Sequence, residues 1–301
     1  MTSTPKHFLD ISAIESENLH QIIKRGHQYK NDEMPTRPLE GKMLAMVFDK
    51  PSTRTRVSFD VGMRQLGGET IILSGAEMQL GRGETIADTA RVLSRYVDAI
   101  MIRTTEHTRL IELAENATVP VINGLTDDTH PCQIMADVMT IEEKLGSAKS
   151  KKLAWTGDGN NVLNSLIEGA VAFGYEIDIA VPEGRGPSQA IVENARARGA
   201  IVNIGTNAES AVTDADCVIT DTWSSMGFED ETCGHNTFQP YQVNQRLMTM
   251  AGENAIFMHC LPAHRGEEVT DEVLDGPQSV VFDEAENRLH VQKAILAWCF
   301  E

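Results

Sequence analysis

The chain has 301 residues, of which 41% are hydrophobic and 5% aromatic, and it carries a formal net charge of −18. This composition is that of a globular protein rather than a disordered one, and the length is sufficient for two α/β domains. The strong negative charge argues against a nucleic-acid partner or an anionic membrane surface, so we expect a small ligand.

The sequence also restricts the compartment and the cofactors. Its five cysteines form no C-x-x-C pair, and an odd number leaves one unpaired in any disulfide scheme, which is typical of a reducing compartment. No zinc-binding pattern occurs, residues 1–9 have no apolar signal core, and no apolar run reaches the roughly 18 residues of a membrane span. We therefore expect a cytoplasmic protein without membrane association.

In the first half of the chain, expected strands alternate with expected helices. Apolar runs predict strands at 43–48, 69–73, 99–103 and 119–123. Helical periodicity predicts helices at 86–97 and 109–117 between them, and this alternation indicates a parallel sheet flanked by helices. A longer helix is expected at 133–145, and the Gly-Ser-Ala-Lys-Ser stretch after it places a domain boundary near Ser147.

The alternation restarts after this boundary and predicts a second parallel sheet. Its strands are expected at 152–156, 176–181, 201–204, 217–220 and 255–258. The stretch 284–300 has helical periodicity, and we expect its apolar side to pack back onto the first domain. The predicted fold class is therefore α/β, with two domains that are each a parallel sheet flanked by helices. The predicted boundaries are 1–146 for the first domain, 147–283 for the second and 284–301 for the returning C-terminal helix.

The first expected strand leads into a turn rich in hydroxyl and guanidinium groups, Ser52-Thr53-Arg54-Thr55-Arg56, which opens a helix. Backbone N–H groups at a helix start, hydroxyl donors and arginine forks can hold a phosphate dianion from several sides. The alternative is an N-capped helix with a solvated basic first turn. Basic residues at a helix start oppose the helix dipole unless an anion offsets them, and this favours the anion site.

Other polar residues follow the expected strands at their ends, where open parallel sheets place ligand sites. Arg103 ends the third strand, and His130-Pro131-Cys132-Gln133 follows the fourth. Pro131 suits a first helical turn, so His130 is presented at a helix N-terminus, which lowers the histidine pKa. A neutral imidazole there can donate a hydrogen bond to a carbonyl oxygen. A structural polar role is the alternative, and the proximity of Arg103 and of the arginine-rich turn favours the functional one.

In the second expected domain, Gly157-Asp158-Gly159-Asn160-Asn161 follows the first strand and precedes a helix. It superficially resembles the dinucleotide-binding G-x-G-x-x-G motif but lacks the third glycine. The better interpretation is a pair of amides at a helix start that can meet a substrate carboxylate. The run 221–227 follows the fourth strand, and Asp221 offers a carboxylate for an ammonium group, with an ordinary loop as the alternative.

The fifth expected strand of this domain ends in His259-Cys260-Leu261-Pro262. The neighbouring histidine suggests a thiol nucleophile, but adjacent strand residues point to opposite faces, so direct activation of Cys260 by His259 is awkward. A buried structural cysteine is the alternative. Glu267 and Glu268 follow soon after, and the sequence leaves their roles open.

Together these motifs resemble the aspartate/ornithine carbamoyltransferase family, and its ornithine branch most closely. The resemblance runs in family order through 48–56, 130–133, 157–161, 221–227 and 259–262, which span nearly the whole chain. It implies two small-molecule substrates, carbamoyl phosphate and L-ornithine, and a homotrimer with sites at subunit interfaces. It implies no metal and no organic cofactor.

The resemblance also implies roles for individual residues. The implied catalytic residues are Arg54, Arg103, His130, Asp221 and Cys260. The implied carbamoyl phosphate contacts are Ser52, Thr53, Arg54, Thr55, Gln79, Arg103, His130, Gln133 and Arg288, and Gln79 enters from the neighbouring subunit. The implied ornithine contacts are Asn161, Asp221, Ser225, Met226, Cys260 and Leu261.

The implied reaction transfers the carbamoyl group to the δ-amine of ornithine, giving citrulline and phosphate, in arginine metabolism. The neutral amine attacks the carbamoyl carbon, and Arg103, His130 and Thr55 stabilise the negative charge that develops on the carbonyl oxygen. Arg54 stabilises the departing phosphate. Two bound reactants can react through orientation and electrostatics, so no covalent intermediate is required. Whether citrulline is made or broken down is left open, as are the binding order and assembly beyond a trimer.

Two other functions compete with this one. A non-catalytic sensor of phosphate and an amino acid could use the same scaffold, because a fold does not determine a function. Retention of all the implied reacting-centre residues argues against a sensor. A nicotinamide oxidoreductase would rest on Gly157-Asp158-Gly159 and is disfavoured by the incomplete motif.

Overall fold

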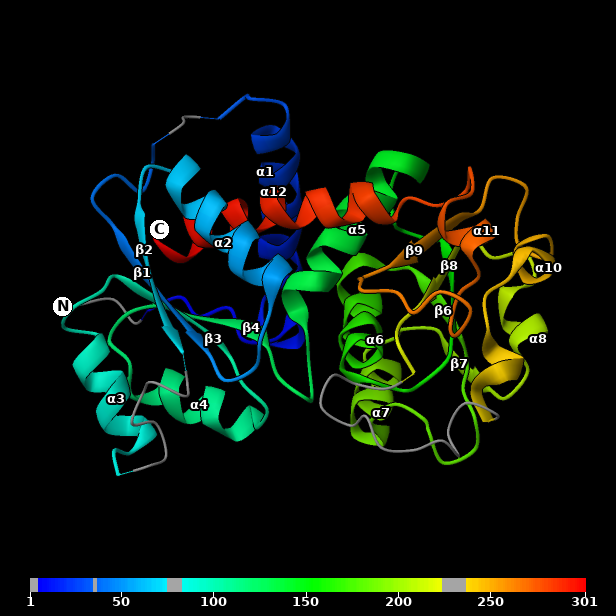
Figure 1. Cartoon of the computed structure of the whole chain (residues 1–301), viewed down its shortest axis with the longest axis horizontal. Coiled ribbons are helices and arrows are strands. Elements are labelled where there is room, and N and C mark those ends of the chain that lie inside the picture. The colour runs from blue at the N-terminus through cyan, green and yellow to red at the C-terminus, as the bar shows by residue number, and fades with distance from the viewer. Residues whose placement is uncertain (1–4, 35–36, 75–82, 224–236) are drawn as a thin grey trace. The chain divides into compact units, whose positions relative to one another are not determined.

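The computed structural model describes residues 5–34, 37–74, 83–223 and 237–301. The chain forms two compact units (Figure 1). The first unit comprises Met1–Met135 together with Asn287–Glu301, and the second comprises Ala136–Glu286. Among the helices of the described ranges, none combines the length and the apolar character that a membrane crossing requires.

The first unit contains the predicted parallel sheet, whose strand order is β2-β1-β3-β4. The strands are β1 (Met43–Phe48), β2 (Glu69–Ser74), β3 (Ala99–Arg103) and β4 (Val121–Leu125). β4 begins at Val121 rather than at residue 119, because Pro120 has no N–H to donate and takes part only as the carbonyl acceptor of the Ile100 N–H, at 2.9 Å.

Helices cover both faces of this sheet (Figure 1). They are α1 (Ser16–Lys30), α2 (Thr53–Gln65), α3 (Ile86–Leu93), α4 (His107–Asn116), the start of α5 (Pro131–Leu145) and the last part of α12 (Val281–Cys299), with a short 3-10 turn, η1 (Ile11–Ala13). α3 ends at Leu93 rather than at residue 97. The Ser94 hydroxyl donates a hydrogen bond to the Ala90 carbonyl at 2.7 Å. It therefore competes with the main-chain hydrogen bonds of the helix where the helix ends.

The C-terminal helix packs on the first unit, as predicted. Gly62 of α2 lies so close to α12 that an added Cβ would be 3.3 Å from Lys293 and 3.5 Å from Leu289. Near the end of α12, Trp298 meets the Phe8 ring edge-on at a centroid distance of 6.4 Å. The last residues of the chain are therefore a structural part of the first unit.

The second unit contains the second predicted parallel sheet, in the order β7-β6-β5-β8-β9. Its strands are β5 (Lys152–Thr156), β6 (Glu176–Ala180), β7 (Val202–Gly205), β8 (Cys217–Thr220) and β9 (Ile256–His259). Its helices are α6 (Asn161–Phe173), α7 (Gln189–Ala197), α8 (Ala208–Val212), α10 (Gln245–Met248) and α11 (Asp271–Leu274), with a 3-10 turn, η2 (Gln239–Tyr241). The predicted strand at 176–181 is one residue longer than β6, and those predicted at 201–204 and 255–258 lie one residue before β7 and β9 at both ends.

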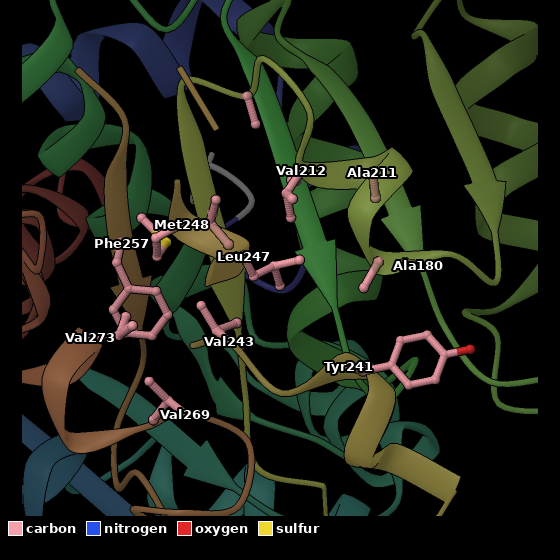
Figure 2. Packing of buried hydrophobic residues seen from close by; sticks show 14 of the residues in the cluster. Ala180, Ala211, Val212, Tyr241, Val243, Leu247, Met248, Phe257, Val269 and Val273 are labelled. Carbon is pink, nitrogen blue, oxygen red and sulfur yellow. The ribbon is translucent and has the colours of Figure 1, made fainter. Parts of the chain in front are cut away.

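An apolar cluster fixes the two strands that carry the second unit's candidate residues. Val218 of β8 and Phe257 of β9 are fully buried members of this cluster. Phe257 packs there with Val212, Leu247 and Val273 from the surrounding helices (Figure 2). Close packing of this kind tolerates little displacement. The carboxyl ends of β8 and β9 are therefore held in one register.

Candidate active site

The strand order shows at which point along the edge of each sheet a ligand can bind. In the first unit the chain passes from β1 to β2 on one side and then to β3 on the other, so β1 and β3 flank a topological switch point. Phe48 pairs with Arg103 there, which sets the turn after β1 beside Arg103. In the second unit β5 and β8 flank the equivalent point, and Asp221 directly follows β8.

The arginine-rich turn opens α2 as the sequence predicts. Ser52 is the N-cap residue, with extended backbone at φ −158°, but its side chain makes no capping hydrogen bond. Arg54 lies half-buried in the first helical turn, whereas Arg56 is exposed. The first N–H groups of a helix lack intrahelical partners, and a ligand anion can satisfy them in place of a side-chain cap.

Thr55 is the point where two distant arginines meet. Its hydroxyl oxygen accepts hydrogen bonds from Arg103 Nη1 at 3.3 Å and from Arg288 Nη2 at 2.8 Å. All three side chains are buried, with exposed fractions of 1%, 6% and 4%. A hydroxyl oxygen has two lone pairs, so these bonds use both and leave the Thr55 hydrogen to be donated to a further acceptor.

His130 lies among the same positive charges. It precedes Pro131, the first residue of α5, and it is buried. Burial, followed by the charges of Arg288, Arg103 and Arg54, lowers the pKa of His130 well below its usual value. The imidazole is therefore neutral at neutral pH, and it keeps one N–H that can be donated to a carbonyl oxygen.

Two neighbours of His130 on α5 have different characters. Gln133 is fully buried, and its main-chain N–H bonds to the His130 carbonyl at 3.1 Å. Cys132 is also fully buried; burial raises its pKa to about 12, and its thiol donates to the Asn123 carbonyl at 3.3 Å. Cys132 is therefore a structural thiol, whereas Gln133 supplies an amide in the vicinity of His130.

The first unit thus gathers three guanidinium groups, a neutral imidazole and a threonine hydroxyl at one sheet edge. Every one of these groups can donate a hydrogen bond, and three of them carry positive charge. Such a set favours a small anion that also has a carbonyl oxygen, in a protein whose overall charge is strongly negative.

In the second unit, Asp221 is the centre of a hydrogen-bonded group. Its Oδ1 accepts from the Thr222 N–H at 2.8 Å and from the Cys260 thiol at 3.1 Å, and its Oδ2 accepts from Asn160 Nδ2 at 2.6 Å. The register explains the second bond, because Thr220 pairs with His259 and the next residue of each strand is Asp221 or Cys260. The Asp221 carboxylate is therefore oriented by hydrogen bonds to both of its oxygens.

Cys260 does not have the surroundings of a nucleophile. Burial raises its pKa well above the usual thiol value, and the neighbouring Asp221 carboxylate raises it further. The His259 imidazole bonds instead to Glu268 and to the Leu261 N–H. The thiol is therefore protonated at neutral pH, and the structure gives it the role of hydrogen-bond donor to Asp221.

Asn160 is one of the two amides that the sequence offers to a substrate carboxylate, and the structure shows it bonded instead to Asp221. Its Oδ1 caps α6 by accepting from the N–H groups of Val162 and Leu163 at 3.0 and 3.1 Å, while its amide donates to Asp221. Asn161, the residue implied by the family resemblance, is the first residue of α6 and is partly exposed. The N-cap position after Gly159 was visible in the sequence, but the bond to Asp221 depends on tertiary pairing.

The structure separates the two glutamates whose roles the sequence left open. Glu268 is fully buried, and its Oε1 lies 3.1 Å from His259 Nε2. Glu267 is partly exposed and lies 3.5 Å from His264 Nδ1. Glu268 is therefore connected, through His259, to the end of β9 that directly precedes Cys260.

The glycines of the incomplete dinucleotide motif have a packing explanation. An added Cβ at Gly159 would lie 2.4 Å from the Arg185 carbonyl oxygen, so the close approach of the 185–187 segment requires glycine there. Gly157 has a φ of 128°, which strains any residue with a side chain. These two glycines need no nucleotide to account for them.

Two groups in the described ranges bring possible metal-ligand atoms within 4.8 Å of one another: Asp221 with His259 and Cys260, and His264 with Glu267 and Glu268. In the first group the thiol is protonated and already bonded to Asp221. In the second, a Glu268 oxygen already accepts from the His264 N–H and from His259. Hydrogen bonding explains both groups, and the absence of a metal stays a prediction.

Three predicted site residues lie outside the described residues. They are Gln79, Ser225 and Met226. The remaining predicted residues fall into two sets, one in each unit. The first-unit set is Ser52, Thr53, Arg54, Thr55, Arg103, His130, Gln133 and Arg288, and the second-unit set is Asn161, Asp221, Cys260 and Leu261.

Family models match both halves of the chain. Residues 6–143 match the carbamoyl-P binding domain of aspartate/ornithine carbamoyltransferase, and residues 149–299 match the Asp/Orn binding domain of the same family. The boundary between the two matches lies close to Ser147, and together they cover nearly the whole chain.

Individual relatives show the same likeness over their full length. The ornithine carbamoyltransferase of Rhizobium johnstonii is 67% identical over 300 residues, which cover 98% of this chain and 98% of that protein. The solved ornithine carbamoyltransferase of Pyrococcus furiosus has a TM-score of 0.93 and 49% identity, with 99% and 97% of the two chains covered. The anabolic ornithine carbamoyltransferase of Campylobacter jejuni has a TM-score of 0.93 and 39% identity, with 98% and 99% covered. This chain belongs to the aspartate/ornithine carbamoyltransferase family.

Proposed function

We propose that this protein is an enzyme that transfers the carbamoyl group of carbamoyl phosphate to the δ-amine of L-ornithine, giving L-citrulline and phosphate. The observation that carries the proposal is the buried convergence of Arg103 and Arg288 on the Thr55 hydroxyl, beside a neutral His130. These donors match a phosphate joined to a carbamoyl group. The relatives at 65–67% identity, all of them ornithine carbamoyltransferases, support ornithine as the acceptor.

We assign carbamoyl phosphate to the first domain, 1–146 with the returning helix 284–301. The phosphate meets Arg54 and the N–H groups at the start of α2, with the hydroxyl groups of Ser52 and Thr53 as further donors. The carbamoyl oxygen meets the Thr55 hydroxyl, the Arg103 guanidinium and the His130 imidazole. The assignment is supported by the donors themselves, which are aimed at one sheet edge.

The remaining contacts of carbamoyl phosphate come from more distant parts of the chain. Arg288 adds a positive charge from α12, and the Gln133 amide can bond to the carbamoyl NH₂ group. Gln79 is proposed to reach the same substrate from a neighbouring subunit. Gln133 is fully buried close to His130, which supports its role.

We assign ornithine to the second domain, 147–283. The Asp221 carboxylate accepts the ammonium group of the amino acid, and Asn161 at the start of α6 meets its carboxylate. Ser225 and Met226 complete the amino-acid end, and Cys260 with Leu261 lines the part of the site near the reacting amine. The hydrogen bonds from Asn160 and Cys260 orient Asp221 for this contact.

The chemistry follows from these positions. The neutral δ-amine attacks the carbamoyl carbon, and negative charge moves onto the carbonyl oxygen, where Arg103, His130 and Thr55 stabilise it. The bond between the carbamoyl carbon and the phosphate oxygen then breaks, and the attacking nitrogen gives up one proton, which the departing phosphate can accept. Arg54 and Arg288 stabilise that phosphate. His130 suits this role because a neutral imidazole donates its N–H without needing to titrate. Orientation and electrostatics are sufficient for the transfer, so the protonated Cys260 thiol need not form a bond to the substrate.

We further propose a cytoplasmic homotrimer that acts in arginine biosynthesis. The four described cysteines are all free thiols, which fits a reducing compartment. The Campylobacter jejuni relative is an anabolic enzyme, which favours the synthetic direction. Growth of an arginine-requiring strain that lacks its own ornithine carbamoyltransferase tests this role. If the gene restores growth without arginine, the anabolic role holds, and if growth needs arginine although active enzyme is present, it fails.

The reaction itself is tested by measuring citrulline and phosphate together. Purified protein given carbamoyl phosphate and L-ornithine should release both products in equal amounts. Omission of ornithine should stop phosphate release above the uncatalysed rate. Binding of both substrates without citrulline would instead indicate a sensor, and a fluorescence change on titration with a nicotinamide cofactor would support the oxidoreductase.

The subunit arrangement is tested by mixing two inactive variants. Arg54→Ala chains and Gln79→Ala chains are denatured, combined in equal amounts and refolded. A site that takes Arg54 from one chain and Gln79 from its neighbour is intact in about a quarter of random combinations, so activity should return to roughly that fraction. Mixed trimers that stay as inactive as their parents would refute the shared site.

A further inference from the structure

A fully buried imidazole and a fully buried carboxylate meet at the end of β9. His259 Nε2 and Glu268 Oε1 lie 3.1 Å apart, and both residues have an exposed fraction of 0%. Buried polar groups are costly unless their hydrogen bonds are made, so a pair of this kind holds its partners in one arrangement. Neither residue has a role in the transfer reaction as proposed above.

The second nitrogen of this imidazole shows which proton it carries. Its Nδ1 lies 2.9 Å from the main-chain nitrogen of Leu261. A backbone N–H can only donate, so Nδ1 must be the unprotonated nitrogen, and the ring hydrogen therefore lies on Nε2. Nε2–H then donates to Glu268, and the carboxylate selects the tautomer that Leu261 requires.

Glu268 is itself held from several sides. Its Oε1 also accepts from the His264 N–H at 2.5 Å, and its main-chain oxygen accepts from the N–H of the fully buried Val243 at 2.8 Å. On the other side of His259, Glu284 Oε2 accepts the His259 main-chain N–H at 2.9 Å. His259 is thus held at its imidazole by Glu268 and at its main chain by Glu284, and the ring held in this way can keep the Leu261 N–H in place.

The turn that receives this support needs it. Leu261 has a φ of 58°, in the left-handed region that residues with a side chain rarely adopt. The preceding residue, Cys260, donates its thiol hydrogen to Asp221 at 3.1 Å. If the Leu261 N–H lost its acceptor, the turn would relax, and the thiol and the Leu261 main chain would shift relative to Asp221.

We propose that Glu268 is a positioning residue for the acceptor amino acid, acting through His259 on the Cys260–Leu261 turn. The inference rests on the proposed function, because that function assigns Asp221, Cys260 and Leu261 to ornithine. Glu268 itself touches no substrate. Its neighbour Glu267, which is partly exposed and lies 3.5 Å from His264 Nδ1, serves as the matched control.

Steady-state kinetics of Glu268→Leu, Glu268→Gln and Glu267→Leu test the positioning role. Glu268→Leu should raise the KM for ornithine by about tenfold or more, the effect of losing one buried hydrogen bond, and leave the KM for carbamoyl phosphate within about twofold. Glu268→Gln should restore most of the loss, because an amide oxygen can accept from both His259 and His264. Glu267→Leu should leave both KM values unchanged. A Glu268→Leu variant with an unchanged ornithine KM, or with both KM values raised alike, overturns the role.

A double variant tests whether the effect passes through His259. In His259→Asn the shorter side chain no longer reaches Glu268. Adding Glu268→Leu to it should change the ornithine KM by less than about twofold, because coupled residues are not additive. If the two substitutions raise the ornithine KM by factors that multiply, as independent effects do, Glu268 does not act through His259.

A third measurement uses the unmodified protein and holds even if Glu268→Leu fails to fold. Nitrogen NMR of protein labelled at histidine, with His259→Asn used to assign the signal, should show a hydrogen on Nε2 and none on Nδ1. A hydrogen on Nδ1 overturns the inference. Failure of the proposed function looks different, because wild-type protein would then form no citrulline, whereas failure of the inference leaves wild-type citrulline formation intact.

Discussion

The Arg288 guanidinium donates a hydrogen bond to the Thr55 hydroxyl at 2.8 Å, although 233 residues separate them in the sequence. Arg288 belongs to the C-terminal helix and Thr55 to the first turn of α2. The helix returns to the first unit and adds a buried positive charge to a cluster that the N-terminal sheet begins. The end of the chain therefore contributes to the proposed phosphate site as well as to packing.

From this cluster of positive charges we predict that Arg54→Ala loses most of its turnover but stays folded. Arg54 is only half-buried and adds little to packing, but its removal takes away a charge that stabilises the departing phosphate. We expect kcat to fall by about a hundredfold or more, the size seen when one stabilising donor is removed. Arg54→Lys should recover little of it, because an ammonium group cannot reproduce the guanidinium fork.

The control for this variant is Arg64→Ala, on the same helix. Arg64 is exposed and pairs only with Asp60, at 3.0 Å, among the described ion pairs. It should retain wild-type turnover and a similar melting temperature. An Arg54→Ala protein that unfolds, or that keeps most of its turnover, would support the alternative of a solvated basic helix start.

Because the attacking amine must be neutral, we predict that activity rises toward alkaline pH. A free alkylammonium group has a pKa of about 10.4, so only a small part of ornithine is reactive near pH 7. His130 stays neutral above its usual pKa, and the Cys260 thiol stays protonated, so neither should mask this rise. The kcat/KM for ornithine should increase from pH 6 to 9 by up to about tenfold per unit. A flat profile would contradict rate-relevant deprotonation of the amine.

The lowered pKa of His130 predicts a specific dependence of stability on pH. In the unfolded chain a histidine takes up a proton below about pH 6.5, whereas buried His130 resists it. The unfolded state then binds more protons, so the free energy of unfolding decreases as the pH falls from 6.5 toward the folded-state pKa.

A variant without the His130 imidazole should not show this part of the decrease in the free energy of unfolding. Between pH 7.5 and 5.5, His130→Gln should lose about 1 kcal/mol less unfolding free energy than the wild type. Urea unfolding at a fixed protein concentration measures the difference. Equal pH slopes for the two proteins would show that His130 is not held neutral in the folded state.

The bond between Asn160 and Asp221 predicts an effect on ornithine alone. Asn160→Ser keeps an N-cap for α6, because serine caps helices well, but it removes the amide that donates to Asp221. The KM for ornithine should rise by about tenfold, as for a hydrogen bond to a charged group, with little change in melting temperature. Asn207→Ser is the matched control, since Asn207 caps α8 by accepting from the Ser210 N–H and belongs to a different helix from the one beside Asp221. Equal KM values in both variants would remove Asn160 from the site.

The two sheets could be predicted from the sequence because each strand is a short, nearly continuous apolar run. Met43–Phe48 is buried along most of its length, and such runs are typical of parallel strands covered on both faces. Element ends were less predictable. Pro120 and Ser94 shift β4 and the end of α3 through single hydrogen-bonding effects that a periodic pattern does not contain.

The candidate site was predictable only in part. Arg103 ends β3 and His130 lies shortly after β4, so the topology places both, whereas only the family resemblance indicates Arg288, because no local pattern links it to Thr55. Asn160 and Glu268 gain their roles from the pairing of neighbouring strand ends and from a buried loop. Such partners depend on tertiary structure and cannot be read from spacing along the chain.

The most direct test of the central claim is a competition between acceptors. The protein is given carbamoyl phosphate and an equimolar mixture of L-ornithine, putrescine, L-aspartate and N-acetylornithine, and the carbamoylated products are measured by mass spectrometry. Putrescine lacks the carboxylate and N-acetylornithine lacks the α-ammonium group, so each leaves a group at the amino-acid end of the site without its partner, a loss of about 1–3 kcal/mol. L-Aspartate has no δ-amine to attack the carbamoyl carbon. Citrulline should therefore exceed every other product by about tenfold or more. Comparable amounts of any other product, or no citrulline, would contradict the assignment of ornithine to Asp221 and its neighbours.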